Sequence, residues 1–360
     1  MKTKFNVIDL FCGCGGLSKG FELAGMQCVG GIDFNRPAID TFSKNFKHAK
    51  GWCVNLLDTS TKDIQNFVSQ IPPVDIIIGG PPCQGFSSAN RYQKKNADPR
   101  NKLFFQFVKF VDAIKPKAIV IENVRGIITK DNGYAKEKIY EIFEKRGYKV
   151  NHMVLDASDY GVPQKRLRNF FVILQNEIFD FNNIKKGHSV VTVKNAIGEL
   201  YNLENNREDI KSIHIAPSSA YRRYLRGKKD LIFNHDIRYP APQVQRRISF
   251  VPPGGNWKDV PQKLWPTNRN NRHSSAYKRL DENLVSVTID TGNNHSNYFH
   301  PKYNRIPTVR EAARLQSFPD DFIFVGNRSE QYRQVGNAVP PLLAKAIAEE
   351  IKLILNKNEK

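Results

Sequence analysis

The first 175 residues alternate short apolar segments with segments of helical periodicity, and this alternation constrains the fold more than any other feature. A β-α-β-α order of this kind is typical of a parallel sheet with helices on both faces. We therefore predict an α/β fold with a doubly wound, mostly parallel, Rossmann-like sheet. The expected strands are 5–11, 28–33, 53–57, 74–80, 118–123, 148–155 and 168–174, and the expected helices are 16–24, 36–46, 61–70, 101–114 and 135–145.

The alternation stops after residue 175. Residues 176–305 are rich in Asn, Arg, Pro and Tyr and contain few long apolar runs, which predicts a second, smaller, loop-rich domain. Regular structure resumes with a helix over 308–316 and a closing amphipathic helix over 338–355, for which Asn337 is a suitable N-cap. The predicted division is one domain of residues 1–175 plus 306–360 and a second domain of residues 176–305.

The positive charge of the chain is concentrated in one segment. Residues 211–280 hold fifteen Lys and Arg against three acids, so they carry +12 of the formal net charge of +20. Six Tyr and Trp side chains are interleaved with these basic residues. The combination favours a polyanion such as double-stranded DNA as the partner, and a well-solvated basic surface is the alternative.

The five cysteines are too few, and odd in number, for a disulfide framework: Cys12, Cys14, Cys28, Cys53 and Cys83. The sequence contains neither a C-x-x-C pair nor a His cluster with zinc-like spacing, so we expect no metal site. No apolar run approaches the ~18 residues of a membrane helix, and the N-terminus does not read as a signal peptide. These features predict a cytoplasmic protein.

A glycine-rich loop and a strand-end acid suggest a nucleoside pocket. The first strand runs into Phe11-Cys12-Gly13-Cys14-Gly15-Gly16, which matches neither G-x-G-x-x-G nor a P-loop. Asp33 ends the second strand, where an acid can accept hydrogen bonds from ribose hydroxyls. Loop and acid together fit an adenosine ligand without pyrophosphate, such as S-adenosylmethionine (SAM). An ordinary tight turn and a helix-capping role for Asp33 are the alternatives.

The third strand offers Asn55 or Asp58 to an adenine ring, and Phe11 and Phe34 could stack on it. Ligands of open α/β sheets bind at the carboxyl ends of the strands. The residues that fall there, and that we expect to form one composite site, are Gly13, Asp33, Asn55, Cys83 and Glu122.

The fourth strand is followed by Gly79-Gly80-Pro81-Pro82-Cys83, where two prolines present Cys83 at the strand tip. Five basic residues between 91 and 102 would favour the thiolate, the nucleophilic form of Cys83. A buried structural cysteine is the alternative. Glu122 at the end of the fifth strand could protonate a ring nitrogen. Arg166 and Arg168 would share a face of an extended segment, although each could instead form a surface ion pair.

With these residues in view, the chain resembles the single-chain bacterial cytosine-5 DNA methyltransferases. The matching motifs occur in the family's order between residues 9 and 341: DLFCGCGGLSKGF, GGPPCQGFS, ENVRG, QKRLR, REAARLQSFPD and VGNAVPP. The resemblance implies a SAM-dependent methyltransferase fold and identifies the variable insert, 176–305, as the target recognition domain. Several ordered motifs make a chance match improbable.

The resemblance also implies a role for each matching residue. Cys83 would attack C6 of a flipped-out cytosine, since a stacked base cannot be reached. Glu122 would hold and protonate N3, Arg166 would contact the base carbonyl, and Arg168 would lie nearby. Residues 85–102 resemble a mobile loop that closes over the base. The implied SAM contacts are Phe11, Gly13, Gly15, Gly16, Leu17, Asp33, Phe34, Asn55, Asp58, Pro81, Asn337 and Val339.

One departure from the family pattern affects the adenine contact. Many relatives have Gly-Asp-Ile where this chain has Val54-Asn55-Leu56, so the choice between Asn55 and Asp58 stays open. Residues 211–300 would read bases in the major groove, and Arg222, Arg223, Arg226, Lys228 and Lys229 would contact phosphates. We expect a monomer that acts on chromosomal DNA in a restriction-modification or an orphan methylation role, with a separate restriction endonuclease as a potential partner.

Three rival functions are weaker. An amino-group methyltransferase would place Asp or Asn before the Pro-Pro pair, whereas Gly80 stands there. A tRNA methyltransferase of the same fold would lack so large a basic insert. A catalytically inactive DNA-binding regulator would not need Cys83, Glu122, Arg166 and the glycine loop together.

Overall fold

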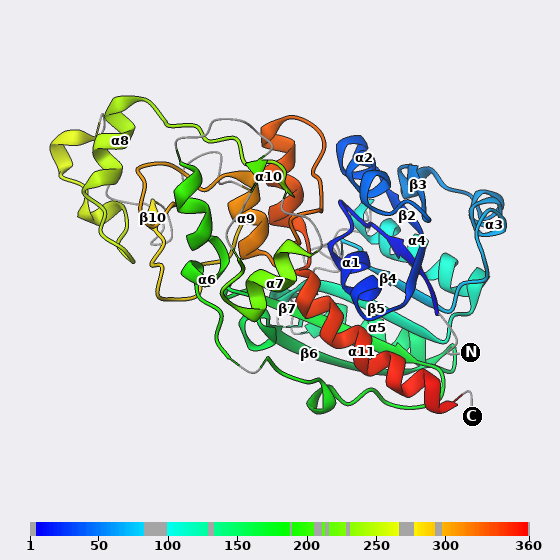
Figure 1. Cartoon of the computed structure of the whole chain (residues 1–360). Helices are drawn as coiled ribbons and strands as arrows, with labels where there is room; N and C mark the ends of the chain where they lie inside the picture. Colours follow the sequence, from blue (N-terminus) through cyan, green and yellow to red (C-terminus); the bar gives the residue numbers. More distant parts are fainter. Residues whose placement is uncertain are drawn as a thin grey trace. The chain divides into compact units, whose positions relative to one another are not determined.

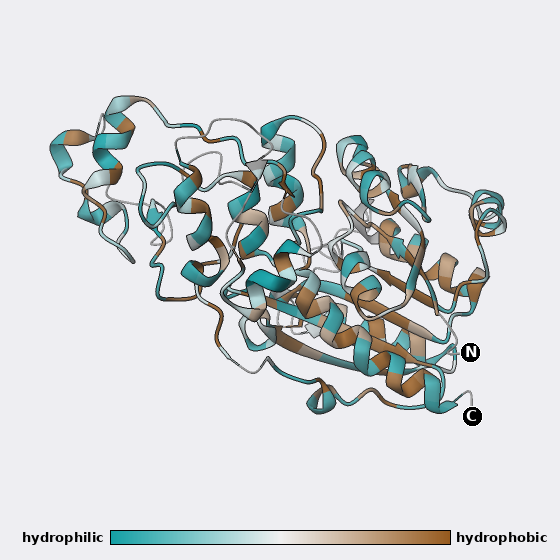
Figure 2. Ribbon diagram, in the orientation of Figure 1, coloured by the Kyte–Doolittle hydropathy of each residue, from teal (hydrophilic) through white to brown (hydrophobic). Residues whose placement is uncertain are grey.

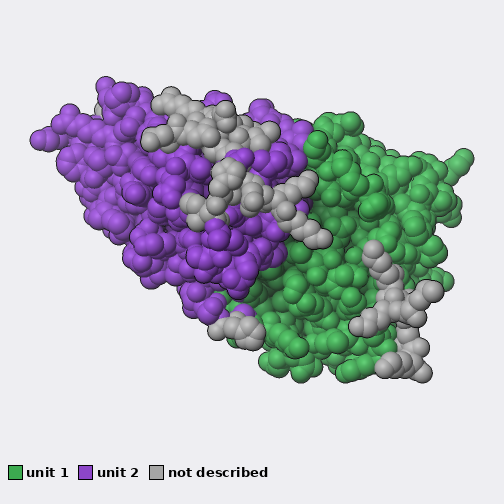
Figure 3. All heavy atoms as spheres, viewed as in Figure 1, with its two compact units in different colours: residues 1–160, 167–186, 339–360 green, residues 161–166, 187–338 purple. Residues whose placement is uncertain are grey.

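The computed structural model describes residues 5–82, 99–128, 133–187, 189–204, 211–212, 216–227, 231–265, 277–291 and 297–358. Within these residues the chain divides into two compact units, coloured separately in Figure 3. Unit 1 comprises Met1–Tyr160, Leu167–Lys186 and Val339–Lys360, and unit 2 comprises Gly161–Arg166 and Gly187–Ala338.

Unit 1 is built on a seven-stranded sheet in the order β3-β2-β1-β4-β5-β7-β6 (Figure 1). The pairs β3-β2, β2-β1, β1-β4 and β4-β5 are parallel, whereas β7 runs antiparallel to both β5 and β6. The mostly parallel, doubly wound α/β fold predicted from the sequence is therefore confirmed. The strands are β1 Asn6–Leu10, β2 Gln27–Asp33, β3 Lys50–Cys53, β4 Ile76–Gly79, β5 Ala118–Val124, β6 Lys149–Asp156 and β7 Leu167–Leu174.

Helices cover both faces of this sheet, and Figure 2 shows hydrophobic colouring along its strands. On one face, Phe104 and Phe107 of α4 and Phe143 of α5 join Ile119 and Phe171 of the strands in one buried cluster. On the other, α1 packs so closely on α11 that a Cβ on Gly20 would lie 2.2 Å from the Cβ of Ala344. The helices are α1 Gly16–Leu23, α2 Arg36–Asn45, α3 Thr61–Ser69, α4 Pro99–Ile114, α5 Tyr134–Glu144 and α11 Pro341–Asn358.

Unit 2 contains short elements around several small cores. Its helices are α6 Val193–Ile197, α7 Ala220–Arg226, α8 Pro242–Ser249, α9 Val309–Leu315 and α10 Arg328–Asn337. Its strands are β8 Lys211–Ser212, β9 Leu231–Ile232, β10 Lys278–Arg279 and β11 Tyr298–Phe299. Buried ion pairs supplement the apolar contacts: Arg314 contacts Glu199 and Asp320, and Arg305 contacts Glu204 and Glu311.

Two local predictions were wrong. The third strand ends at Cys53 and does not span 53–57, because the Asn55 side chain accepts a hydrogen bond from the Leu57 amide and starts a 3-10 turn over Leu56–Asp58. Asn337 is not the N-cap of the closing helix. It is the last residue of α10, and α11 begins at Pro341, since proline is favoured at the first position of a helix. No helix in the described ranges is long and apolar enough to cross a membrane.

Candidate active site

The strand order creates a switch point between β1 and β4. From β1 the chain moves outward to β2 and β3, and it then returns to the other side of β1 for β4 and β5. Ligands of such sheets bind beyond the carboxyl ends of the strands at this point. In this chain the glycine loop follows β1 and the Gly80-Pro81-Pro82-Cys83 segment follows β4. The two segments that sequence analysis selected therefore begin at neighbouring strand ends.

The loop after β1 has a backbone conformation that few residues tolerate. Phe11 has φ 64°, Gly13 has φ 53° and Gly15 has φ 94°. A Cβ on Gly15 would lie 2.4 Å from the Cε2 atom of Phe46. This position therefore requires glycine both because its φ is positive and because a side chain would have no space. A left-handed conformation at a phenylalanine is strained, and such strain concentrates at binding and catalytic sites.

Asp33 fastens this loop to the end of β2. Its Oδ2 accepts a hydrogen bond from the Gly13 amide at 2.9 Å, and its Oδ1 accepts one from the Asn35 amide at 2.8 Å. Burial raises the pKa of the Asp33 carboxyl, and the hydrogen bonds from the backbone oppose that rise. Each carboxylate oxygen has two lone pairs, so Asp33 can hold the loop and still accept a bond from a ribose hydroxyl.

Phe34 and the Asn55–Asp58 pair lie at the ends of β2 and β3. The Phe34 side chain is 72% exposed, which is unusual for a phenylalanine and leaves its ring available for stacking. The side-chain amide of Asn55 donates to Oδ2 of Asp58 at 3.0 Å, and both residues are exposed. The two candidates for the adenine contact thus form one hydrogen-bonded pair.

The segment that leads to Cys83 is held by β5. Asn123 donates from Nδ2 to the carbonyl oxygen of Pro81 at 3.0 Å. A Cβ on Gly80 would lie 3.2 Å from Oε2 of Glu122, so a larger residue at this position would crowd that carboxylate. Residues 83–98 lie outside the described residues. They include Cys83 itself and most of the predicted mobile loop, 85–102.

Glu122 and Arg168 form an ion pair across β5 and β7. Arg168 Nε lies 3.0 Å from Glu122 Oε1, and their side chains are 18% and 15% exposed. The antiparallel register, which pairs Glu122 with Phe170 and Val124 with Arg168, places the two side chains diagonally on one face. The pair is only partly open to solvent, so it can meet a ligand while it is weakly screened.

Arg166 has a different environment from Arg168. The sequence predicts that both lie in one extended segment, but β7 begins at Leu167 and Arg166 belongs to unit 2. Its side chain is 1% exposed and donates to the carbonyls of Ile289 and Gly336, at 2.9 and 2.7 Å. Asn337, at the end of α10, is exposed, and the buried Val339 begins the last segment of unit 1.

The four described cysteines are free thiols. Cys12, Cys14 and Cys28 are buried, and burial raises the pKa of each, in the case of Cys14 to about 12. Such thiols stay protonated near neutral pH and are poor nucleophiles. Cys53 is half-buried, and its thiol donates to the Phe34 carbonyl oxygen at 3.5 Å.

Asp9 is a site-adjacent acid that the sequence reasoning missed. It is the next-to-last residue of β1, is 1% exposed, and accepts a 2.5 Å hydrogen bond from the Ser18 hydroxyl. Burial raises its pKa to about 7, and the Ser18 hydrogen bond works against that rise. An acid inside an apolar strand was the available signal, because such a residue is seldom buried without a partner.

The basic segment of unit 2 divides into internal and exposed cations. Arg226 is buried 3.9 Å from Glu199, and Arg222 donates to the carbonyls of Asn195 and Lys194. The burial of Arg226 argues against the predicted phosphate contact of this side chain, whereas the predicted contact of the half-buried Arg222 stays a prediction. Arg223 is exposed, and Lys228 and Lys229 lie outside the described residues.

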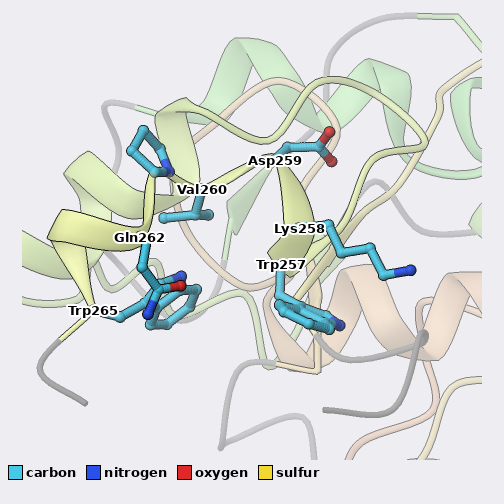
Figure 4. A pocket seen from close by; sticks show the side chains of 7 residues that line it. Trp257, Lys258, Asp259, Val260, Gln262 and Trp265 are labelled. Carbon is cyan, nitrogen blue, oxygen red and sulfur yellow. The ribbon is translucent and has the colours of Figure 1, made fainter. Parts of the chain in front are cut away.

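A pocket in unit 2 is lined by residues 257–262 and by Trp265 (Figure 4). The cavity of about 270 Å³ is lined by Trp257, Lys258, Asp259, Val260, Pro261, Gln262 and Trp265. The Arg247 guanidinium lies 5.3 Å from the centre of the Trp265 ring, and Lys258 Nζ lies 6.0 Å from that of Trp257. Arg246, Lys258 and Lys263 are exposed, so this surface is suited to a polyanion.

Comparisons with known proteins extend over the whole chain. The profile of the family described as C-5 cytosine-specific DNA methylase matches residues 5–353. The Type II methyltransferase M.DdeI of Desulfomicrobium norvegicum is 38% identical, covering 96% of this chain and 88% of that protein. The Type II methyltransferase M1.HphI of Haemophilus parahaemolyticus is 39% identical, with coverages of 98% and 87%. A solved E. coli structure, a candidate DNA modification methyltransferase encoded within a prophage, is 28% identical with a TM-score of 0.80, covering 98% of this chain and 100% of that one.

Proposed function

The chain belongs to the C-5 cytosine-specific DNA methylases, and on that premise we propose which of its residues carry out the reaction. It is a methyltransferase that acts on C5 of cytosine in DNA, as are the type II enzymes to which it is similar. The roles of individual residues, the reading of DNA by unit 2 and the biological setting are the subjects of the proposal.

One observation carries the assignment of the reaction centre. The Asn123–Pro81 hydrogen bond fixes the backbone two residues before Cys83, and Glu122, the residue before Asn123, lies beside Gly80. A nucleophile and an acid that approach one ring must be held in a fixed relation, because small displacements cost large factors in rate. We propose that β4 and β5 provide this relation for Cys83 and Glu122.

The proposed chemistry begins with attack by the Cys83 thiolate on C6 of an extruded cytosine. A bond forms between sulfur and C6, the ring electrons move towards N3, and the Glu122 carboxyl gives N3 its proton. C5 becomes electron-rich and attacks the methyl carbon of the donor, so the bond between that carbon and the donor's sulfur breaks and the demethylated donor leaves. N3 returns its proton to Glu122, and a base takes the proton from C5. The electrons of the C5–H bond then form the C5–C6 double bond as the sulfur–C6 bond breaks, which restores the aromatic ring and frees the Cys83 thiolate.

The geometry favours Arg168 for the contact to the base carbonyl that the resemblance assigned to Arg166. Arg168 is ion-paired with Glu122 and partly exposed, so a base held by Glu122 would be within its reach. Arg166 is buried and donates to two backbone carbonyls. We propose that Arg168 binds O2 of the cytosine and keeps Glu122 oriented, and that Arg166 acts indirectly.

The methyl donor fits the residues at the ends of β1, β2 and β3. We propose S-adenosylmethionine, with its ribose on Asp33, its adenine stacked on Phe34 and the exocyclic amine donated to Asp58, which Asn55 orients. The turn at Phe11 and Gly13 leaves space where a side chain would otherwise stand, since no atom lies within 4 Å of a Cβ built on Gly13. The remaining proposed contacts are Gly15, Gly16, Leu17, Pro81, Asn337 and Val339.

We propose that residues 176–305, most of which belong to unit 2, form the target recognition domain and read the target sequence, and that Cys83, Glu122 and Arg168 of unit 1 carry the chemistry. The exposed Arg246, Lys258 and Lys263 are the proposed phosphate contacts, in place of the buried Arg226. We propose that the protein methylates chromosomal DNA in the bacterial cytoplasm as a monomer, in a restriction-modification or an orphan methylation role. In a restriction-modification role, a cognate restriction endonuclease would act separately.

Bisulfite sequencing tests the proposed function directly. DNA from cells that express the wild-type protein should contain unconverted cytosines at one short recurring sequence, and expression of Cys83→Ser should leave every cytosine convertible. The same protein should not methylate tRNA. Absence of any methylated DNA sequence in cells with folded wild-type protein would refute the function, and methylated tRNA instead would favour the closest rival enzyme.

A further inference from the structure

The three backbone carbonyls that flank Asn337 are all held by buried side chains of unit 2. Gln316 donates from Nε2 to the carbonyls of Val335 and Ala338, at 3.0 and 2.8 Å. Arg166 donates from its NH2 group to the carbonyl of Gly336 at 2.7 Å. These carbonyls lie in the last turn of α10 and just beyond it, where carbonyls lack the usual helical partner four residues on, although that of Val335 also accepts a 3.3 Å hydrogen bond from the Ala338 amide. Arg166 and Gln316 therefore act as a side-chain cap, which we call the α10 clamp.

The two clamp side chains are themselves buried and held by neighbouring hydrogen bonds of unit 2. Gln316 and Arg166 are 0% and 1% exposed. Gln164 accepts from the Ile289 amide at 2.8 Å and donates to the carbonyl of Leu315, and Arg166 binds the Ile289 carbonyl. Gly336 presses on the same segment, since a Cβ there would lie 2.4 Å from the carbonyl carbon of Asp290. The end of α10 is thus fixed from several directions.

Only one residue within the clamped turn remains available to a ligand. Val335 and Gly336 are buried and Ala338 is half-buried, whereas the Asn337 side chain is exposed. A cation at a helix C-terminus is also favourable to the helix dipole, so Arg166 stabilises this end electrostatically as well as through its hydrogen bond. The clamp fixes the backbone of a residue whose side chain is free to bind.

We propose that Arg166 and Gln316 are positioning residues that hold Asn337 for the methyl donor. The inference rests on the proposed function, in which Asn337 contacts S-adenosylmethionine. Arg166 also lies two residues before Arg168, so the same side chain anchors the segment that leads to the base-binding ion pair. It touches neither substrate, and its loss should be felt first in the affinity of the DNA-free protein for the donor.

The test measures S-adenosylmethionine binding by calorimetry with no DNA present. Arg166→Lys keeps the charge but not the planar, two-pronged donor, and it should weaken binding about tenfold. Gln316→Met should do the same. Asn337→Ala should weaken binding as well, and adding Arg166→Lys to it should change little, because residues acting through one contact are not additive.

Arg279→Lys is the matched control. Arg279 is 5% exposed, belongs to the same unit, and donates to the carbonyls of Val251 and Ile248. Its replacement should lower the melting temperature but leave donor affinity within about twofold of wild type. Donor binding that is unchanged in folded Arg166→Lys, or equally weakened in Arg279→Lys, would overturn the proposal.

The remaining outcomes are also decisive. If Arg166 contacted the base instead, Arg166→Lys would reduce kcat and leave donor binding without DNA intact, which overturns the clamp. If Arg166→Lys does not fold, Gln316→Met alone decides, since it removes the other two bonds. A wild-type protein that fails to bind the donor would refute the proposed function itself, a result distinct from failure of the clamp.

Discussion

Arg168 Nε lies 3.0 Å from Glu122 Oε1, across two strands that are distant in sequence and antiparallel in the sheet. The guanidinium can stabilise the Glu122 carboxylate and leave its second oxygen, beside Gly80, directed at the segment that leads to Cys83. An acid that must hold and protonate a ring nitrogen needs such an orientation, because general acid catalysis depends on geometry before pKa.

Glu122→Gln should reduce kcat by a factor of about 10² to 10³, because the amide can hold the base but cannot deliver a proton efficiently. Single-turnover transfer of a radiolabelled methyl group measures this step. Glu141→Gln, which removes a half-buried acid of α5 that is ion-paired with Lys138 and Lys145, serves as the control and should retain full activity. A Glu122→Gln protein with a wild-type rate would remove Glu122 from the mechanism.

Asp33→Ala should weaken donor binding by about tenfold or more, since the proposed ribose contact and the hydrogen bond to the Gly13 amide are both lost. Calorimetry on the folded variant provides the measurement. Asp63→Ala removes a different capping carboxylate, at the start of α3, and should leave donor affinity unchanged. Equal affinities for Asp33→Ala and wild type would mean that the donor binds elsewhere.

Asp9 should make stability depend on pH. Its pKa is raised from 3.8 to about 7 on folding, so its contribution to stability is fully present below pH 3.8 and is lost as pH rises through 7. The side chain of an Asp9→Asn variant does not titrate, so the variant does not lose this stability as pH rises. The difference in unfolding free energy between the variant and wild type should shift by on the order of 4 kcal/mol in favour of the variant between pH 4 and pH 8. Urea unfolding at several pH values measures it, and a constant difference would contradict the buried acid.

The exposed cations of unit 2 should dominate the salt dependence of DNA binding. Each phosphate contact contributes about 0.9 to the slope of log affinity against log salt, so the triple variant Arg246→Gln, Lys258→Gln, Lys263→Gln should flatten that slope by about 2.7. Lys44, Lys62 and Lys149 are exposed in unit 1, and their replacement makes the same charge change as a control. If both triple variants change the slope equally, the effect is one of net charge.

The sequence predicted the sheet well because its strands are apolar runs separated by helical periodicity, a local signal. The third strand was displaced because Val54-Asn55-Leu56-Leu57 looks extended, whereas Asn55 caps a 3-10 turn and Leu56 enters the core. Helix α10 was missed, since its segment RSEQYRQVGN shows little amphipathic pattern. The partner of Arg166 could not be predicted, because the Gly336 carbonyl lies 170 residues away in sequence.

Among the candidate site residues too, those with a local sequence signal could be predicted and those that depend on distant contacts could not. Asp33 and Phe34 could be identified from position relative to strand ends, which is local information. The burial of Arg226 beside Glu199 depends on how α7 packs, so its basic character alone could not predict that it would be turned away from solvent. The burial of Asp9 could not be predicted, because its hydrogen-bond partner Ser18 lies on the following helix.

Trapping on 5-fluorocytosine tests the central claim, that Cys83 forms a covalent bond to the target base. Fluorine at C5 cannot leave as a cation, so the methylated adduct cannot break down. Once the target sequence is mapped, a duplex carrying 5-fluorocytosine there should form, with S-adenosylmethionine, a complex that survives denaturing electrophoresis. Cys83→Ser should abolish the complex, because a hydroxyl is a far weaker nucleophile than a thiolate, while Ser at Cys12, Cys14, Cys28 or Cys53 should leave it intact. A denaturation-resistant complex formed by Cys83→Ser would contradict the account.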